Sequence, residues 1–534
     1  MIKKLMALIL CGLFVLSFVG CGPEKTPEPV GGDTEIDYNG VININLPTKD
    51  FPYEDNAIKA VADAYTEKHP ETKINVQTKE SATYKDWLDS QFAGGETVTD
   101  ADIVQTLLIS NTYLSTKMVD FSDYLVKKNP YADEKVWKDT MSEEAYPLSA
   151  DRTGVYSLSY TSTMSLFFYN KSIWRQAGLV NTDGTDKIPQ TWDELVEFCK
   201  AIKELTGKIP FTVGGSTYTT NAMSWLTNIY TDQYYRGAAE LFHAVAGDYC
   251  YDPDIDADWT LDVTNRNNDS SSNYTVNMLR FLKAIDDGEI SPGDAKYQAM
   301  MNNFKKLIPD YTQTNFTSNN YYQAEENFWS QKACLVYNTS DFFNTYKQIF
   351  AARPDAEQFD IGFFLAPPMT GTGASAPDAD YVRSVGGAYG YYGVVKKDKA
   401  HNDLVMDFMM FWGSKEGQDI YNASMEEQGA YTSGDSLIND VEVPSSIYPA
   451  KDIEFPGLCH NNPMGNHFGN LCAMNGTVSQ SWNMYCKQFF DGNVDTATFC
   501  NNLERALKAG IPDYLKTLNW RSDALSDVTK NPSL

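Results

Sequence analysis

The sequence predicts a large, globular α/β protein, and one observation supports each of these three properties. Between residues 41 and 105, short apolar strands alternate with amphipathic helices, which is the pattern of parallel strands joined by helices. Hydrophobic residues make up 42% of the chain, close to the average for globular proteins. At roughly 100–200 residues per domain, a length of 534 residues corresponds to about three domains or to two large lobes.

The first part of the chain supplies the clearest elements. Val41–Leu46 alternates apolar and polar residues, as a half-buried strand does, and Pro47 ends this run. The next apolar positions recur with helical spacing until Pro70 stops them. The predicted elements are a strand at 41–46, a helix around 57–65, a strand at 74–76, a helix at 84–92 and a strand at 102–105.

Later elements follow from similar signals. Residues 156–160 alternate large side chains with serine and predict another strand. Thr191 and Glu194 form a capping box before an apolar helical face, and Gly207 is placed to end that helix. The segment from about 237 to 317 is rich in Asn, Asp, Ser and Tyr, and we interpret it as an insertion-rich part of one lobe. Further helices are expected around 276–285, 404–412 and 503–507.

The N-terminus predicts export and a lipid anchor. Residues 1–20 have a basic start and an apolar run that is too short to span a membrane, as in a secretory signal peptide. Phe18–Cys21 resembles a bacterial lipobox, in which Cys21 is diacylated, and two acyl chains give stable anchoring. The alternative is an ordinary signal with an incidental cysteine. Residues 21–40 have the composition of a disordered tether.

Composition excludes some classes of function. The formal net charge of -28 and the pI near 4.5 argue against nucleic-acid binding, which needs a basic face. Aromatic residues reach 13%, and Tyr, the most numerous of them, favours half-wet surfaces. Seven of the 9 cysteines remain once Cys11 and Cys21 are set aside, and an odd number without tight spacing predicts free thiols.

No catalytic motif stands out, although a glycosidase-type pair of acids is not excluded by the sequence. Two clusters have metal-ligating side chains. Cys459, His460, His467 and Cys472 are zinc-type ligands in an unsuitable spacing, and the aspartates between 252 and 258 lack the glycine and the final glutamate of a calcium loop. We expect no metal and no cofactor, and leave both clusters open.

A series of motifs points to one family. Leu166–Lys171 (LFFYNK), Ala177–Leu179 (AGL) and Ile188–Leu195 (IPQTWDEL) follow one another, and Phe328–Cys334 and Asp407–Gln418 come later in the same order. With these motifs the chain resembles the extracellular solute-binding proteins of ABC importers, family 1, the sugar-binding group that includes maltose-binding protein. The resemblance covers the mature chain, which has extra residues around 237–320 and 435–475.

The resemblance implies a two-lobed, periplasmic-binding-protein-like α/β fold with hinge crossings between the lobes. The implied crossings lie near 160–163 and 386–389. By that pattern the N-terminal lobe comprises 41–160 and 388–430, and the C-terminal lobe comprises 164–385 and 431–534.

By the same resemblance, the ligand lies between the lobes, where aromatic faces stack on sugar C–H faces while amides and carboxylates bind hydroxyl groups. The implied ligand-binding residues come from the ends of strands, from the crossings and from aromatic positions of the second lobe. They are Thr48, Asp50, Gln105, Thr106, Tyr160, Thr163, Trp225, Asn338, Asp341, Phe342, Tyr389 and Trp482.

The function expected from this resemblance is that of a monomeric, lipid-anchored binding subunit on the outer face of the cell membrane. It would capture an oligosaccharide without catalysis and deliver it to an ABC permease. Two alternatives stay open, which are a peptide-binding importer subunit and a surface glycoside hydrolase.

Overall fold

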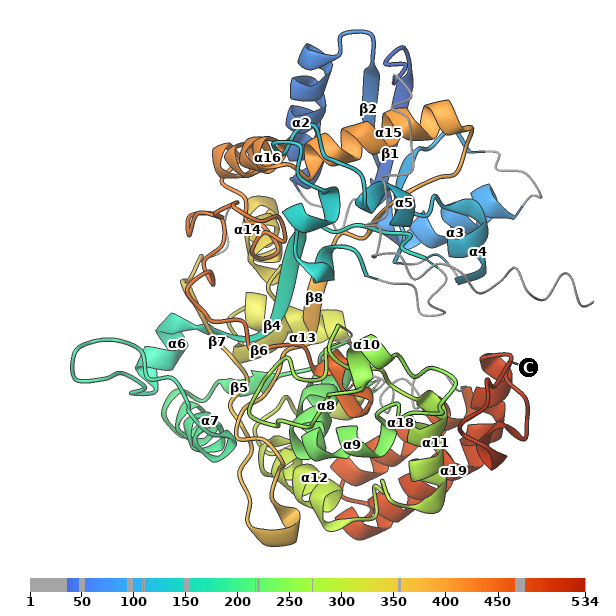
Figure 1. Ribbon diagram of the computed structural model, residues 1–534. Helices are drawn as coiled ribbons and strands as arrows, with labels where there is room; N and C mark the ends of the chain where they lie inside the picture. The colour runs from blue at the N-terminus through green and yellow to red at the C-terminus, as the bar shows by residue number, and fades with distance from the viewer. Residues whose placement is uncertain are drawn as a thin grey trace, which may run out of the picture.

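The structure is a computed structural model, and it places two α/β lobes one above the other, with β4 and β8 between them (Figure 1). The fold class predicted from the sequence is confirmed. The residues that the structure describes are 36–47, 53–93, 99–107, 109, 111–147, 154–216, 218, 221–270, 272–353, 357–465 and 476–533.

The sheet of the upper, N-terminal lobe has the strand order β2-β1-β3-β9. Its strands are β1 (Val41–Pro47), β2 (Lys73–Lys79), β3 (Ile103–Gln105) and β9 (Tyr392–Val394). β1 pairs in parallel with both β2 and β3, as the alternating pattern predicts, whereas β9 returns from the second half of the chain and pairs antiparallel with β3. The helices of this lobe are α2 (Glu54–Lys68), α3 (Ser81–Phe92), α4 (Asn111–Lys117), α5 (Ser122–Leu125), α15 (Lys399–Trp412) and α16 (Lys415–Glu427).

The sheet of the lower, C-terminal lobe has the order β5-β6-β4-β7, and β8 pairs with the first half of β4. Its strands are β4 (Thr161–Asn170), β5 (Ile209–Thr212), β6 (Ala333–Thr339), β7 (Ile361–Phe364) and β8 (Gly386–Tyr389). The strand predicted at 156–160 is wrong, because this stretch forms only an isolated bridge at Leu158 and the regular strand begins at Thr161.

Helices surround this second sheet. They are α6 (Lys171–Gln176), α7 (Trp192–Thr206), α8 (Asn221–Tyr234), α9 (Ala239–Phe242), α10 (Pro253–Asp256), α11 (Met278–Asp287), α12 (Ala295–Leu307), α13 (Tyr321–Trp329), α14 (Phe342–Ala352), α18 (Gly476–Phe490) and α19 (Thr496–Thr517). α7 starts and stops as predicted, since Thr191 Oγ1 accepts from the Glu194 amide and Gly207 has φ 68°. The Glu194 carboxylate, however, accepts from the Gln190 amide.

Two large apolar cores support the two sheets. One core contains Trp174, Trp192 and Phe499 around the C-terminal sheet, and the other contains Val61, Phe408 and Trp412 around the N-terminal sheet. The second core also includes Phe342 and Tyr448, which the sequence assigned to the C-terminal lobe. The lobe boundaries drawn above therefore stay predictions.

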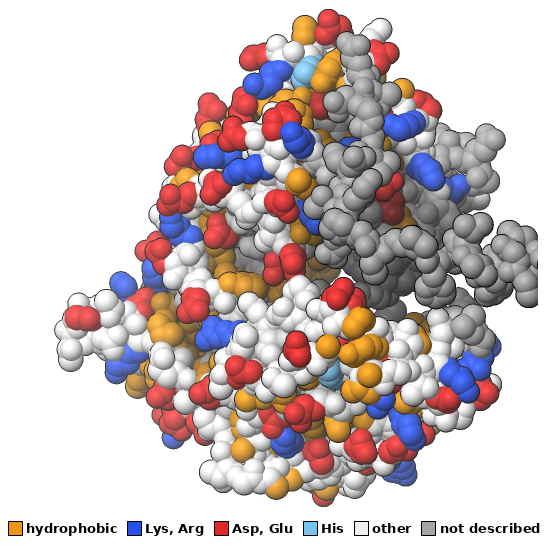
Figure 2. Space-filling view, in the orientation of Figure 1, with side chains coloured by type: hydrophobic (Ala, Val, Ile, Leu, Met, Phe, Trp, Pro, Cys, Tyr) orange, Lys and Arg blue, Asp and Glu red, His pale blue; other side chains and the backbone are white. Residues whose placement is uncertain are grey.

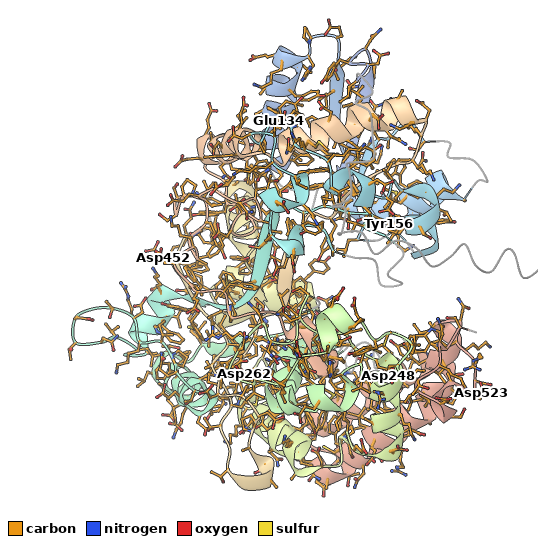
Figure 3. The ribbon with its side chains drawn as sticks, in the orientation of Figure 1. Glu134, Tyr156, Asp248, Asp262, Asp452 and Asp523 are labelled. Atoms are coloured by element: carbon orange, nitrogen blue, oxygen red, sulfur yellow. The ribbon has the colours of Figure 1, made fainter. Side chains whose placement is uncertain are left out.

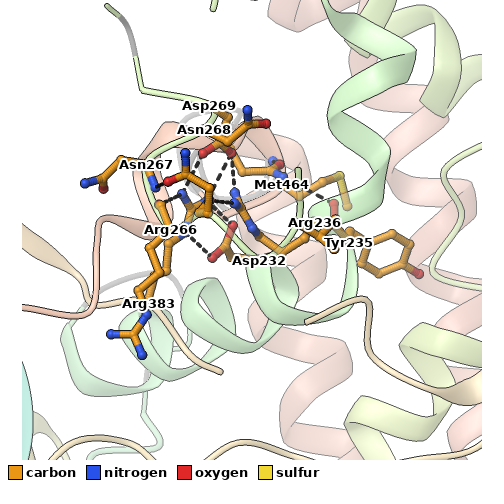
Figure 4. A network of polar contacts seen from close by, with 12 residues as sticks. Asp232, Tyr235, Arg236, Arg266, Asn267, Asn268, Asp269, Arg383 and Met464 are labelled. Carbon is orange, nitrogen blue, oxygen red and sulfur yellow. Dashed lines mark hydrogen bonds and ion pairs between the residues drawn. The ribbon is translucent and has the colours of Figure 1, made fainter. Parts of the chain in front are cut away.

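A buried cluster of two arginines and two aspartates ties the inserted segment to the C-terminal lobe (Figure 4). Arg383 donates from Nη2 to Asp232 Oδ1 over 2.6 Å and from Nη1 to Asp269 Oδ1 over 2.7 Å. Arg236, two residues after the end of α8, also donates to Asp269, and its Nη2 donates to the carbonyl of Asn265 over 3.1 Å. Burial raises the pKa of Asp269, but the two arginines bring it below its usual range. The loop 262–269 is thus fixed to α8.

In the N-terminal lobe, a buried carboxylate is held by two tyrosines. Asp407 of α15 is 2% exposed. It accepts from the Tyr65 hydroxyl over 2.7 Å and from the Tyr131 hydroxyl over 2.6 Å, and His69 Nε2 lies 2.8 Å from the same Tyr131 oxygen. Burial raises the pKa of Asp407, although both tyrosine hydrogen bonds lower it.

Asp407→Asn is expected to raise the free energy of unfolding at neutral pH. Because the folded-state pKa lies above the unfolded value, the folded state holds the proton more tightly, and stability falls as pH rises through that window. Asparagine removes the ionisation, and its amide oxygen accepts the same two hydrogens. Urea unfolding measures the gain in the free energy of unfolding at two pH values. One is about pH 4, near the ordinary aspartate pKa, and the other is about pH 7.5. A gain of equal size at both values would contradict this explanation.

Candidate functional site

Three chain segments connect the two lobes. β4 and β8 pair antiparallel, with Thr161 opposite Tyr389 and Thr163 opposite Gly387, and they lie between the lobes in Figure 1. The segment 432–437 runs beside them, since the Ser162 amide donates to the Asp435 carbonyl over 2.8 Å and the Leu437 amide donates to the Tyr160 carbonyl over 2.8 Å. The resemblance implies crossings near 160–163 and 386–389 and a further change of lobe between 430 and 431, close to this third segment.

Close backbone contacts make glycine necessary at this junction. Gly386 has φ 147°, and a Cβ added to it would lie 2.2 Å from the Thr163 carbonyl oxygen. A Cβ added to Gly434 would lie 2.3 Å from the Ser162 carbonyl oxygen. The three segments therefore contact one another through their backbones.

The N-terminal lobe presents the carboxyl ends of β1 and β3 toward this junction. Thr48 and Asp50, which follow β1, lie outside the described residues. Gln105 ends β3 and is 3% exposed, and its side-chain Oε1 is buried without a hydrogen-bond partner in the described structure. Thr106 donates from Oγ1 to the Tyr391 carbonyl over 2.9 Å, which fixes the end of β3 to the chain just after β8.

The C-terminal lobe presents the end of β6 and the first turn of α13. Asn338 donates from Nδ2 to the Tyr321 hydroxyl and to Glu325 Oε1, each over 2.8 Å, and its Oδ1 accepts from the Thr339 amide over 2.9 Å. Asn338 therefore orients its neighbours, and its own amide is used within the lobe. Tyr322 is 61% exposed beside them.

Sequence reasoning missed Tyr321, Tyr322 and Glu325. The available signal was the Asn320–Gln323 capping box, which both side chains form and which marks the start of a helix next to β6. α13 lies at the top of the lower lobe, facing the upper lobe (Figure 1). Asp and Glu side chains are spread over the described surface of both lobes in the space-filling view (Figure 2).

Three of the aromatic rings expected to stack on ligand are enclosed in the cores instead. Tyr160 is 2% exposed and its hydroxyl donates to the Met409 carbonyl over 2.8 Å. Phe342 is 1% exposed and stacks on Trp329 with ring centroids 4.4 Å apart. Trp482 is 4% exposed and donates from Nε1 to the Tyr218 carbonyl over 3.0 Å. These rings have no free face here, so we assign them to packing.

The remaining predicted residues divide between the junction and its edges. Thr163 is buried with its Oγ1 3.1 Å from Ser340 Oγ, which makes it a junction residue. Asp341 accepts from the Thr339 hydroxyl next to the same junction. Trp225 and Tyr389 are half-buried and keep part of their surface exposed.

The structure describes the aspartate cluster in full and only part of the Cys/His cluster. Asp252 caps α10 by accepting from the Asp254 amide over 3.0 Å, whereas buried Asp256 accepts from the Thr275 amide over 2.8 Å. Cys459 is buried, and His467 and Cys472 lie outside the described residues. Within the described ranges, no three His, Cys, Asp or Glu side chains converge as metal ligands.

A polar pocket of about 550 Å³ lies elsewhere on the N-terminal lobe, lined by residues 131–140, the start of α16 and residues 438–440. It contains none of the predicted ligand-binding residues. In Figure 3, Glu134 of this region lies high on the upper lobe, whereas Tyr156 lies near the edge that faces the lower lobe.

Comparisons with known proteins agree with this architecture. A family model described as bacterial extracellular solute-binding protein matches residues 51–419, more than half of the chain. The sequence matches no curated protein. Among the residues described, no helix combines the length and apolar character needed to span a membrane.

Solved structures of the same fold match most of the chain. A family 1 extracellular solute-binding protein from Bifidobacterium longum subsp. infantis is 15% identical, with 88% of this chain and 99% of that chain covered and a TM-score of 0.50. RafE from Streptococcus pneumoniae in its apo-form is 15% identical, with 89% and 98% covered and a TM-score of 0.51. Maltose-bound MalE3 from T. maritima is 15% identical, with 88% and 99% covered and a TM-score of 0.52.

These likenesses to solved structures show the two-lobed fold, and the family model adds the sequence relationship over 51–419. The chain belongs to the bacterial extracellular solute-binding protein family.

Proposed function

We propose that this chain is the substrate-binding subunit of an ABC importer, and that it captures an oligosaccharide between its lobes and delivers it to the permease without chemical change. The family match over 51–419 carries the binding role. The sugar class is supported by relatives of the same fold whose names include a saccharide, such as maltose-bound MalE3 and a chitin oligosaccharide binding protein with a TM-score of 0.52.

The side-chain oxygen of Gln105, which has no hydrogen-bond partner among the described residues, is the contact that best fits this function. A buried polar atom without a partner costs roughly 1–3 kcal/mol, and a sugar hydroxyl that donates to it would recover this free energy on binding. Tyr322, Tyr389 and Trp225 supply partly exposed rings for sugar C–H faces. The proposed ligand contacts are therefore Gln105 and these three rings, together with Thr48, Asp50 and Asp341.

Gln105→Met is expected to have opposite effects on stability and on binding. Methionine has a similar shape and removes the unpaired oxygen, so the ligand-free melting temperature should stay equal or rise. Affinity for the sugar should fall about tenfold, the effect of losing one hydrogen bond of about 1.4 kcal/mol. Thermal melting and calorimetry measure the two effects.

Thr106→Val is the matched control for this variant. The Thr106 hydroxyl is already paired with the Tyr391 carbonyl, so its removal should lower the melting temperature. If Gln105→Met binds sugar as tightly as the wild type, Gln105 is not a ligand contact.

We also propose that Cys21 carries the lipid and that residues 21–40 tether the body to the outer face of the membrane. The full chain has a net charge of -28, and loss of Lys3 and Lys4 with the signal peptide makes the body more acidic still. Anionic lipid therefore repels the body, so the acyl chains must supply the anchoring. Cys21→Ala should move the protein from the membrane fraction to the medium and abolish labelling by radioactive palmitate. Retention of the variant at the membrane would contradict a lipid anchor at this residue.

Experiments can distinguish two other functions from the one proposed. A peptide-binding subunit would show a ligand-dependent rise in melting temperature with peptides and none with sugars. A surface glycoside hydrolase would release product from a polysaccharide or from a nitrophenyl glycoside. We expect neither result, and we expect a monomer that does not bind nucleic acid.

A further inference from the structure

One buried hydroxyl lies where two of the three interlobe segments, β4 and 432–437, meet. Ser340 follows β6 and is 0% exposed. Its Oγ accepts from the Met164 amide over 3.2 Å and lies 3.1 Å from Thr163 Oγ1, both on β4. The same Oγ donates to the carbonyl of Ser433, in the residues that open the third connection. The Ser340 amide also donates to the Met164 carbonyl over 2.8 Å.

The Ser340 hydroxyl therefore links separate parts of the chain that must move when the lobes change orientation. A hydroxyl group has one hydrogen and two lone pairs, and here each is matched by a partner. Because the group is fully buried, a lost bond is not replaced by bulk water, and the partners left behind bear the cost. Rotation of the lobes has to preserve or exchange these bonds.

Ser165, two residues after Thr163 on β4, serves as the comparison residue for Ser340. It is 2% exposed, and its Oγ accepts from the Tyr337 hydroxyl over 2.7 Å and from the Val385 amide over 3.1 Å. Ser384, just before β8, lies beside it, with the two Oγ atoms 3.0 Å apart. Ser165 is thus as buried and as well bonded as Ser340, but it has no bond to the segment 432–437 among those the structure describes.

We propose that Ser340 is a positioning residue for lobe closure. Its hydroxyl couples β4 to the segment 432–437, so that the connections bend together and the lobes keep a narrow range of relative orientations. The inference concerns the ligand-free protein, so it stands or falls independently of which ligand is bound.

The test compares Ser340→Ala with Ser165→Ala in the full mature chain without ligand. Small-angle X-ray scattering measures the distribution of radii of gyration, and hydrogen exchange follows the amides of 160–164 and 432–437. Ser340→Ala should broaden the distribution of radii of gyration. It should also speed amide exchange in both segments about tenfold, which corresponds to a free energy of local opening that is lower by about 1.4 kcal/mol. Ser165→Ala should lower the melting temperature without either change.

Two milder variants keep the test decisive if Ser340→Ala folds poorly. Thr163→Val removes one contact of the Ser340 hydroxyl and should broaden the distribution to a smaller extent. Ser433→Ala should leave it unchanged, because Ser340 bonds the Ser433 backbone, and the Ser433 hydroxyl itself has no partner among the described residues. The proposal is overturned if all these variants share the wild-type distribution, or if Ser165→Ala broadens it as much as Ser340→Ala.

Discussion

Arg383→Met should lower the free energy of unfolding by about 3–5 kcal/mol, the range measured when one partner of a buried ion pair is removed. The side chains of Arg383, Asp232 and Asp269 are 0%, 1% and 0% exposed, so the substitution leaves two carboxylates in an apolar interior. Arg236 forms a direct ion pair with Asp269, whereas both ion-pair contacts that the structure describes for Asp232 come from Arg383. Urea unfolding followed by tryptophan fluorescence measures the loss.

Lys306→Met is the matched control for this prediction. Lys306 pairs with Asp193 over 2.6 Å, but the two side chains are 47% and 58% exposed, so the change should cost less than about 1 kcal/mol. The triple variant Arg383→Met, Asp232→Asn, Asp269→Asn should recover part of the loss, because no carboxylate of the cluster is then left buried. Equal losses in the Arg383 and Lys306 variants would contradict the role given to burial.

Gly386→Ala should also be strongly destabilising, by about 2–5 kcal/mol. The residue has φ 147°, which an alanine adopts only with strain of about 1–3 kcal/mol. The added Cβ would lie 2.2 Å from the Thr163 carbonyl oxygen, and relieving such a clash between backbones costs a similar amount. Thermal unfolding of the ligand-free protein checks this value, with loss of the β4–β8 amide protection as the local signature.

Gly184→Ala separates the two causes. Gly184 has φ 86°, and a Cβ added there meets nothing within 4 Å. Only the conformational strain of the backbone therefore remains. Its expected cost is about 1 kcal/mol. If both variants lose the same stability, the close approach of β8 to β4 is not what requires glycine at position 386.

The parts of the fold that follow local rules were predictable from the sequence. The alternation of apolar and polar residues predicted β1, and the capping residues predicted the ends of α7. The structure confirms both elements, because alternation and capping depend on residues that are close in the chain. The return of β9 beside β3 and the third connection at 432–437 were not predictable in this way. Both depend on pairing between residues about 270 or more positions apart, for which the sequence carries no local signal.

The candidate site was harder to predict than the fold. The resemblance gave positions such as Gln105 and Tyr389, but it also gave Phe342 and Trp482, whose rings pack against Trp329 and Phe499. An aromatic side chain suits a core and a sugar equally well, so its identity alone does not distinguish the two. Tyr322 was missed because its exposure depends on the placement of α13 beside β6.

The most direct test of the proposed function is calorimetry of the wild-type mature chain against maltotriose, raffinose, xylotetraose and chitotriose, with a tripeptide mixture as the comparison. We predict saturable binding of at least one oligosaccharide with 1:1 stoichiometry, unchanged sugar after incubation, and a melting temperature that rises with its concentration. Binding of the peptides with no response to any of the sugars would contradict the account.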